Sequence, residues 1–149
     1  VGDLYFPWAK GRDGCRTPMP WESGAHEAGF TSGTPWLPIP DYHIARAADV
    51  QIADENSVLA HARKAVALRK AHPALKLGDM TCFDAEGRVL AFMRESAGER
   101  LLCVFNLGKT AAQFTLPDGT GEPLFEVGKV KRNGMVVSFG PRSGVILMR

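Results

Sequence analysis

The chain has 149 residues, of which 45% are hydrophobic and 23% are charged, the balance of an ordinary globular protein. Its formal net charge of +2 is too small to favour nucleic acid or an anionic membrane surface as a partner. No uninterrupted apolar run approaches the ~20 residues that a membrane span needs. The three cysteines lack C-x-x-C spacing, and so sparse a set predicts reduced thiols in a cytoplasmic protein.

The first 56 residues are rich in glycine, proline and aromatic side chains, and they show no lasting period. All three tryptophans, Trp8, Trp21 and Trp36, lie in this segment. An irregular segment of this length is rare in a compact domain and is usually functional when it is ordered. The first residues contain neither an initiator methionine nor a signal-peptide pattern, so we interpret the chain as part of a longer polypeptide.

Residues 57–72, SVLAHARKAVALRKAH, predict one helix. Asn56 or Ser57 is a suitable N-cap, and Pro73 ends the helix. The apolar positions recur at helical spacing, which predicts that one face packs against a core. This stripe comprises Val58, Leu59, Ala62, Ala65, Val66 and Leu68.

From residue 75 onward the hydrophobic period changes to two, and turn signals such as Ala97-Gly98 and Asn133-Gly134 separate the segments. This pattern predicts a small antiparallel sandwich or barrel. Cys82 and Cys103 lie in these runs and are expected to be small core residues. A run of basic residues at 129–132 predicts a charged strand or turn that faces water. The predicted strands are MTCFD, RVLAFMRE, RLLCVFNL, AQFTL, PLFEV, MVVSF and GVILM.

Searches for a metal, nucleotide or serine-hydrolase motif fail on specific residues. His26-Glu27 begins an H-E-x-x-H match, but Phe30 stands where the second zinc ligand is needed. Gly128-Lys129 resembles the end of a P-loop but lacks the Ser or Thr that binds magnesium, and G-x-S-x-G is absent. We therefore expect no metal site and no cofactor.

The stretch GRDGCRTPMPW, residues 11–21, concentrates polar chemistry in a loop. The planar guanidinium of arginine suits carboxylates, or sugar hydroxyls and the residues around them. Arg12 and Arg16, with Asp13 between them, can form a salt-bridged cluster, and two prolines stiffen the chain that follows. From the residues alone two interpretations stay open: a self-packed structural loop that ties the chain to a neighbouring domain, and part of a binding site.

The string GRDGCRTPMPWE…AGFTSGTPWLP resembles the α-glucosidase branch of the α-amylase superfamily, glycoside hydrolase family 13. In that family a G-R-D-x-x-R-T-P-M-x-W segment follows the eighth strand of the catalytic (β/α)8 barrel. SVLAHARKAVALRKAHPAL is similar to the last helix of that barrel, which an antiparallel β domain follows. The resemblance implies an α+β fragment. Residues 1–73 would be the end of the barrel, with a long loop over 1–56 and the last helix over 57–73, and residues 74–149 a C-terminal antiparallel β-sandwich domain.

The resemblance also implies an α-glucosidase that acts on short α-glucosides by a retaining mechanism. A complete barrel takes ~250 residues, and retaining glycosidases need two carboxylates ~5–5.5 Å apart. The family carries these acids in motifs such as G-F-R-x-D and N-H-D, which are absent here. We therefore expect the catalytic carboxylates to lie outside this chain and the chain alone to be inactive. Its expected partners are an α-glucoside oligosaccharide or disaccharide and the rest of the barrel.

By the same resemblance, the 11–21 loop borders the leaving-group subsite. Arg12 is expected to face the substrate, with Asp13 orienting it. Pro20 departs from the P-M-Q-W of oligo-1,6-glucosidases, so their linkage preference is not carried over. The residues expected to hold the loop in shape are Arg16, Trp21 and Trp36.

Three further interpretations stay open. One is a transglucosylating relative that metabolises sucrose or trehalose. Another is a non-catalytic carbohydrate-binding β module, and the third is a structural domain without sugar contacts. Exposed aromatic platforms would favour the binding module, but phenylalanine is the only aromatic residue after residue 75, and its positions suit a core. These phenylalanines are Phe83, Phe92, Phe105, Phe114, Phe125 and Phe139.

Overall fold

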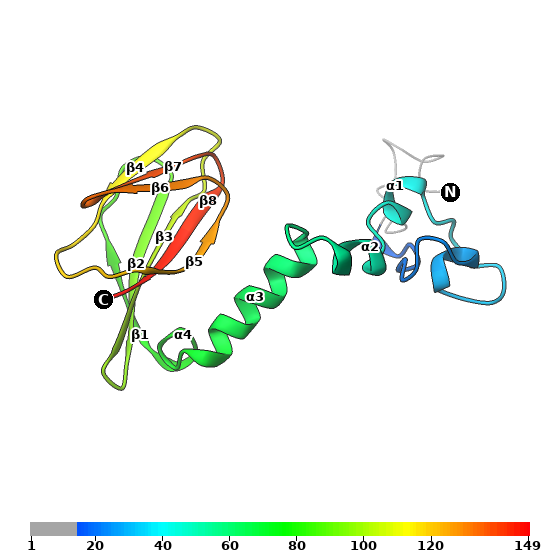
Figure 1. The fold of residues 1–149 in the computed structure, drawn as a ribbon, viewed down its shortest axis with the longest axis horizontal. Coiled ribbons are helices and arrows are strands. Elements are labelled where there is room, and N and C mark those ends of the chain that lie inside the picture. The colour runs from blue at the N-terminus through cyan, green and yellow to red at the C-terminus, as the bar shows by residue number, and fades with distance from the viewer. Residues whose placement is uncertain (1–14) are drawn as a thin grey trace, which may run out of the picture. The chain divides into compact units, whose positions relative to one another are not determined.

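The computed structural model describes residues 15–149 (Figure 1). The chain forms two compact units, of which the first ends at Ala62 and the second runs from Arg63 to Arg149. Arg12 and Asp13 lie outside the described residues. No helix in the described part of the chain is long and apolar enough to cross a membrane.

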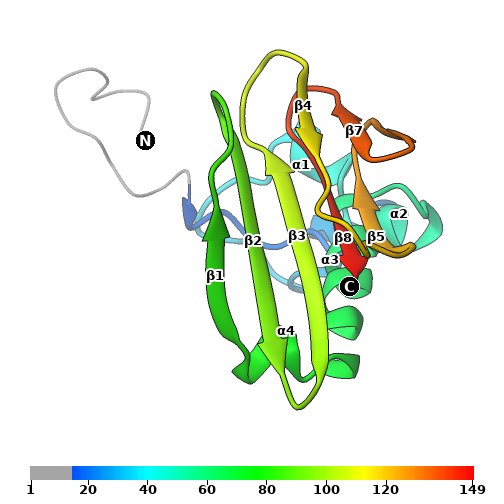
Figure 2. The same cartoon turned by 90° about the vertical axis from the view of Figure 1, so that its left-hand side faces the viewer.

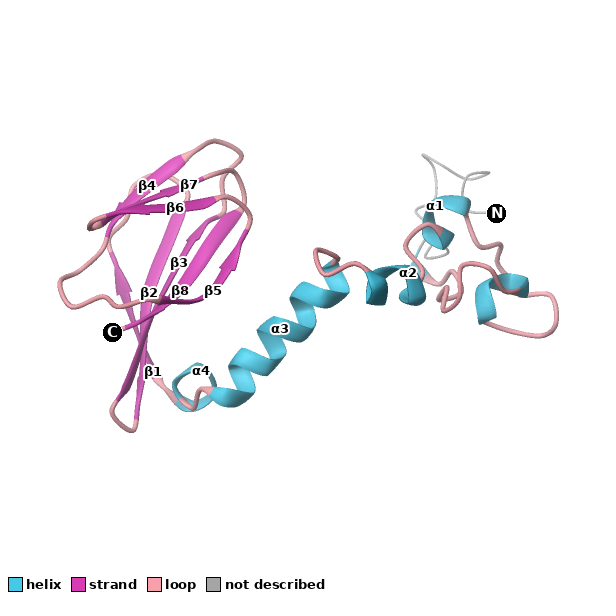
Figure 3. Cartoon of the chain, in the orientation of Figure 1, coloured by secondary structure: helices cyan, strands magenta, loops and turns pink. Residues whose placement is uncertain are grey.

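The first unit consists of short helical turns joined by irregular chain, as Figure 3 shows. The sequence predicted no helix before residue 57, because segments of four to six residues are too short to display a 3.6-residue period. These segments are the 3-10 helix η3 (His26–Gly29), α1 (Asp41–Ile44) and α2 (Ala48–Ala53).

The long helix α3 (Val58–Ala71) begins in the first unit, one residue after its predicted cap. Ser57 Oγ accepts a hydrogen bond from the Ala60 amide at 3.0 Å and donates to the carbonyl of Gln51 at 2.7 Å. The side-chain oxygen of Gln51 accepts the Leu59 amide at 3.2 Å. Two donors of the first turn, which lack partners within the helix, are therefore satisfied by side chains.

The second unit contains a two-layer antiparallel sandwich. Figure 2 shows the five-stranded sheet in the order β1-β2-β3-β8-β5, and the second sheet has the order β4-β7-β6. All seven predicted strands are present. The eighth, β6, falls on the basic run that predicted a charged strand or turn. The strands are β1 (Asp79–Phe83), β2 (Val89–Ser96), β3 (Glu99–Asn106), β4 (Ala112–Thr115), β5 (Pro123–Val127), β6 (Val130–Asn133), β7 (Val136–Phe139) and β8 (Ser143–Met148).

The β2–β3 hairpin shows why the turn signals were reliable. Ser96 pairs with Glu99 across a two-residue loop, so Ala97 and Gly98 are its central residues. Both have positive φ, 52° and 81°, as a type I′ turn requires. This turn continues the right-handed twist of the strands and fixes the register of the hairpin.

The core of the sandwich lies between its two sheets. Leu102 and Val104 of β3 point into it beside Val145 and Leu147 of β8, and each of these side chains is at most 1% exposed. The alternating positions of the central strands point to the opposite face of the sheet. The remaining members of the inter-sheet cluster are Ala91, Met93, Leu116, Val137 and Phe139.

One sequence-based expectation about the core was wrong. Cys103 is buried in the central strand β3, but Cys82 is exposed because β1 is the edge strand of its sheet. Burial raises the pKa of the Cys103 thiol to about 11, against a smaller opposing effect of Arg94. The described part of this chain leaves much of the apolar stripe of α3 exposed, since Val58 is 81% and Val66 53% exposed, and the packing of that stripe against the rest of the barrel stays a prediction.

The six phenylalanines of the β region divide between the two faces of the sheets. Phe139 is fully buried between the sheets. Phe83 and Phe114 pack at the margin of the same cluster. The other three lie on the outer face of the five-stranded sheet, where they line an apolar groove: Phe92, Phe105 and Phe125.

Candidate functional site

The described part of the proline-rich loop is held by backbone hydrogen bonds. The amides of Trp21 and Glu22 both donate to the carbonyl of Ala28, at 2.8 and 3.0 Å. Ala28 is buried and has a positive φ, as does Gly29 with φ of 70°. A Cβ on Gly29 would come within 3.3 Å of the Glu22 Cβ, in a backbone conformation that side chains rarely adopt. The A-G-F string therefore encodes a tight left-handed turn against the W-E pair.

A second set of contacts joins the loop to the start of α2. The carbonyls of Pro20 and Trp21 accept the amides of Ala48 and Asp49, both at 3.1 Å. The Ser23 amide and hydroxyl donate to Oδ2 of Asp49, at 3.0 and 2.9 Å. The Ser23 amide in particular lowers the pKa of Asp49, with a smaller contribution from the Ser23 hydroxyl against an opposing desolvation effect.

The prolines of the loop, and not its tryptophans, are its buried side chains. Pro18 and Pro20 are buried, whereas Trp21 is 53% and Trp36 84% exposed. The Arg16 guanidinium carbon lies 5.6 Å from the centre of the Trp36 ring, within range of a cation–π contact. The structure thus brings Arg16 and Trp36 together, and their role in shaping the loop, like that of Trp21, stays a prediction.

A hollow of about 280 Å³ lies beside the T-P-M-P segment. Thr17 Oγ1 and His43 Nδ1 approach to 3.4 Å at its wall. A hydroxyl, an imidazole, a guanidinium and an amide here surround a space that can hydrogen-bond a polyhydroxylated ligand. Its walls from α1 and α2 were missed, because the sequence gives no signal for either helix. The lining residues are Thr17, Pro18, Met19, Pro20, His43, Arg46 and Gln51.

From residue 15 onward, the loop brings no pair of carboxylates together as a catalytic site would need. Glu22 is exposed, and its backbone serves the turn described above. Among residues 15–149, no group of three histidine, cysteine or acidic side chains could hold a metal ion. Arg12 and Asp13, expected to face the substrate, lie outside the described residues, and their role stays a prediction.

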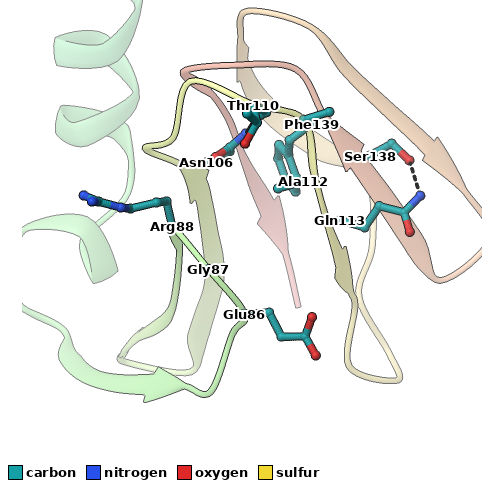
Figure 4. Close-up of a pocket in the computed structure, with 10 residues that line it drawn as sticks. Glu86, Gly87, Arg88, Asn106, Thr110, Ala112, Gln113, Ser138 and Phe139 are labelled. Carbon is teal, nitrogen blue, oxygen red and sulfur yellow. Dashed lines mark hydrogen bonds between the residues drawn. The ribbon is translucent and has the colours of Figure 1, made fainter.

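The second unit has a polar cleft of about 670 Å³ between the 86–88 turn and strands β4 and β7 (Figure 4). Asn106 Nδ2 donates to the carbonyls of Thr110 and Gly140, each at 2.8 Å, and its Oδ1 accepts the Gly108 amide at 2.9 Å. Figure 4 shows the Arg88 side chain extending away from the other lining side chains. The buried polar group of this cleft is therefore satisfied by its own chain, which is the pattern of a structural asparagine.

An apolar groove of about 420 Å³ lies on the outer face of the five-stranded sheet, the face that points away from the inter-sheet core. Ala65 and Leu68 of α3 line one side, and side chains of β2, β3, β5 and β8 line the other. Arg69 and Arg94 bring the only charges among the lining residues. This groove therefore holds apolar side chains of the sheet that are not part of the inter-sheet core.

Comparisons with protein families place both parts of the chain. Residues 5–78 match the model described as "Alpha amylase, catalytic domain", and residues 80–139 match "Maltogenic Amylase, C-terminal domain". A probable alpha-glucosidase of Rhizobium meliloti (strain 1021) is 48% identical over 123 residues, which are 83% of this chain and 22% of that protein. A trehalose-6-phosphate hydrolase of Bacillus subtilis (strain 168) is 35% identical over 111 residues, 74% of this chain and 20% of the relative.

Solved structures agree. An alpha-glucosyl transfer enzyme, XgtA, is 40% identical with a TM-score of 0.80, and the match covers 99% of this chain and 28% of that protein. The trehalulose synthase MutB from Pseudomonas mesoacidophila MX-45 is 31% identical with a TM-score of 0.82, and the match covers 98% of this chain and 27% of that protein. The chain thus spans about a fifth of the length of the curated relatives described above, 22% and 20%. It belongs to the α-amylase superfamily, glycoside hydrolase family 13, and carries the end of the catalytic domain followed by the C-terminal β domain.

Proposed function

We propose that this chain is the C-terminal part of an α-glucosidase that cleaves short α-glucosides with retention of configuration. The observation that carries the proposal is the 48% identity to a probable alpha-glucosidase over 83% of the chain. The names of the other relatives, hydrolases of trehalose 6-phosphate and oligo-1,6-glucosidases, support substrates of one class, because each name specifies a short α-glucoside.

The chemistry of this class requires a nucleophile and an acid/base carboxylate, which a retaining enzyme holds ~5–5.5 Å apart. We assign both carboxylates to the part of the catalytic domain that precedes this chain in the family. What this chain contributes is a boundary of the pocket. In barrels of this kind, loops after the strands surround the active site, and a loop after the eighth strand borders it.

We propose that Arg12 faces the leaving-group sugar, with Asp13 orienting its guanidinium. Support comes from the way the adjoining segment is fixed. Pro18 and Pro20 are buried, and the carbonyl of Pro20 is bonded to the start of α2. A loop with so rigid a C-terminal end can hold an arginine in one orientation, which costs less entropy on binding than a mobile side chain. Hydroxyl pairs of a sugar suit the fork of donors that a guanidinium presents.

We also propose that the domain boundary lies between residues 73 and 74, at Pro73, and that the apolar groove on the β domain packs against the rest of the barrel. The groove is apolar over most of its lining, as an intramolecular interface is. A cytoplasmic location is part of the same proposal, and its support is the small number of cysteines and their lack of C-x-x-C spacing.

Kinetics of the full-length protein test these proposals. Arg12→Ala should lower kcat/KM for an α-linked glucose disaccharide about 10- to 100-fold, the loss of one charge-assisted hydrogen bond set. The kcat/KM of the same variant for p-nitrophenyl α-glucoside should change little, because this substrate has no sugar in the leaving group. Arg63→Ala, on the exposed surface of α3, is the matched control.

Two results would contradict the parts of the proposal separately. Unchanged kcat/KM and acceptor preference in Arg12→Ala would remove the assignment of Arg12 while leaving the activity intact. If the full-length protein released no α-glucose from any short α-glucoside, as followed by the anomeric NMR signals, the proposed activity itself would be wrong.

A further inference from the structure

The carboxylate of Glu99 lies at the corner where α3 ends and α4 (Ala74–Leu77) begins. His72 Nδ1 is 2.5 Å from Oε1 of Glu99, and the Ala74 amide donates to Oε2 at 2.9 Å. The side chains of His72 and Glu99 are 18% and 19% exposed. One carboxylate on the β2–β3 hairpin therefore bonds both sides of Pro73, where the direction of the helical chain changes.

The protonation states of this pair follow from its surroundings. Burial opposes the charge of Glu99, but the hydrogen bonds from the Ala74 amide and from His72, together with the charge of His72, lower its pKa below the ordinary value. An ionised carboxylate only accepts hydrogen bonds. The short contact to His72 therefore requires that the Nδ1 atom of the imidazole carries a proton and donates it.

The corner is tightly packed against the hairpin, beside the end of β2 that Figure 2 shows near α4. Ala74 is fully buried, and its carbonyl accepts Nε of Arg94 at 3.1 Å. A Cβ on Gly78 would come within 2.5 Å of the Ala74 carbonyl oxygen and 2.8 Å of that of Glu95. The backbones therefore approach closely at Ala74, whose amide is bonded to the carboxylate of Glu99.

Protonation of Glu99 would leave the Ala74 amide and His72 with a neutral acceptor, and a hydrogen bond to a neutral acceptor is weaker than one to a carboxylate. Other charged groups face the corner from each element packed on it. The charge of Lys76 of α4 favours the ionised carboxylate, and Arg94 of β2 is bonded to the Ala74 carbonyl at the same corner. On the hairpin itself, Glu95 and Arg100 form a separate exposed ion pair at 3.0 Å. The local balance is therefore cationic around a single, largely buried carboxylate.

We propose that Glu99 is an acid-released latch, which as a carboxylate holds the α3–α4 corner against the β2–β3 hairpin and on protonation frees the corner while the sandwich stays folded. The latch joins the two family regions, because His72 and Ala74 lie in the catalytic-domain match and Glu99 lies in the C-terminal-domain match. This inference goes beyond the proposed function and does not depend on it.

The sign of the pH dependence follows from the lowered pKa. Above the ordinary carboxyl value of 4.5 the contribution of Glu99 to holding the corner is fully present. It is lost as the pH falls through the lower pKa of the folded state. The inter-sheet core contains no ionisable group that titrates in this range, since all its members are apolar. Acid should therefore open the corner before it unfolds the sandwich.

Amide hydrogen exchange of the 149-residue chain, followed by NMR from pH 3 to pH 7, tests the latch. Protection factors, corrected for the intrinsic pH dependence of exchange, are compared between the corner amides of Ala74 and Gly78 and the core amide of Val145. In the native sequence, corner protection should fall below pH 4.5 while Val145 stays protected. Glu99→Gln keeps an acceptor oxygen but removes the charge, so it should lower the Ala74 protection factor about ten-fold at pH 7, the difference between a charge-assisted and a neutral hydrogen bond, and remove the acid step.

Two variants complete the test. Glu95→Gln removes a carboxylate from the same hairpin, in the exposed pair with Arg100, and should behave like the native sequence. His72→Gln should lower the Ala74 protection factor at pH 7 less than Glu99→Gln does, because the charged carboxylate of Glu99 still accepts the Ala74 amide. Native-like protection in Glu99→Gln would overturn the proposal. So would an Ala74 amide that loses protection only together with Val145 at every pH, since the corner would then have no transition of its own.

Discussion

Asn106 at the end of β3 is the position where a single substitution should damage the β domain most informatively. Its side chain is 2% exposed and makes three hydrogen bonds to backbone groups of the loops at that end of the sandwich. Asn106→Leu keeps the size of the side chain and removes all three bonds. The volume filled by leucine also leaves little space for a water to replace the lost partners.

The expected cost follows from what each partner retains. The Gly108 amide is buried and loses its acceptor, which costs about 1–3 kcal/mol. The Gly140 carbonyl keeps a bond from Ser143 Oγ at 2.8 Å, and Thr110 is exposed, so its carbonyl can bond to water. Losing these two bonds adds about 0.5–1 kcal/mol each. We expect Asn106→Leu to lower the free energy of unfolding by about 2–5 kcal/mol, a large part of the ~5–15 kcal/mol of a typical domain.

The assay has to report on the β domain, and tryptophan fluorescence does not, because all three tryptophans lie before residue 37. Urea unfolding followed by far-ultraviolet circular dichroism, with exchange of the Val145 amide as a local probe, measures the sandwich. Gln113→Ala is the matched control, since its bond to Ser138 Oγ at 3.3 Å is exposed and its loss should cost less than ~0.5 kcal/mol. If Asn106→Leu were as stable as Gln113→Ala, the reasoning from buried hydrogen bonds would be refuted.

Two further predictions concern a close backbone approach and a titrating contact. Gly78→Ala should destabilise the second unit by about 1–3 kcal/mol in the same urea assay, because the added methyl meets two backbone carbonyls. Gly121→Ala is the control, because its added Cβ would come no closer than 3.5 Å to another atom, the carbonyl oxygen of Met148. Equal stability of the two variants would contradict the predicted clash at Gly78. In the first unit, the hydrogen bonds from Ser23 lower the pKa of Asp49 below its ordinary value of 3.8. The bonds between Asp49 and Ser23 are therefore fully present above pH 3.8, and they are lost as the pH falls through the lower pKa of the folded state. Tryptophan fluorescence should therefore change in acid, and the change should be absent in Asp49→Asn; an identical transition in that variant would exclude Asp49 as its cause.

The strands of the β domain could be predicted from the sequence because local signals agreed there. The β2–β3 hairpin combines two apolar strands with a turn whose residues suit the backbone, as Ala97 and Gly98 show with their positive φ. The N-cap at Ser57 was predictable for a similar reason, since the cap acts within one helical turn. What these positions share is that the interaction and the residue that encodes it are close in sequence.

The candidate loop was less predictable because its structure depends on distant contacts. Ala28 bonds Trp21 across seven residues, and Ser23 bonds Asp49 across 26. Neither pairing leaves a periodic pattern in the sequence. Large aromatic side chains suggested anchors, but burial falls on Pro18 and Pro20, whose fixed φ lets the loop pack without regular structure. Resemblance to a family identified the loop, and the hydrogen bonds of the structure show how it is held.

The same limit explains why the sequence could not assign the phenylalanines to one core. Strand β3 reads LLCVF, a continuous apolar run, and such a run is typical of a strand that is covered on both faces. Leu102 and Val104 point between the sheets, while Cys103 and Phe105 line the outer groove with Ile146 of β8. A free-standing sandwich would need polar residues on that outer face. The apolar outer face therefore supports the proposal that the five-stranded sheet packs against the rest of the barrel. Replacing Phe105 by a polar residue should then lower the stability of the complete protein more than that of the isolated sandwich.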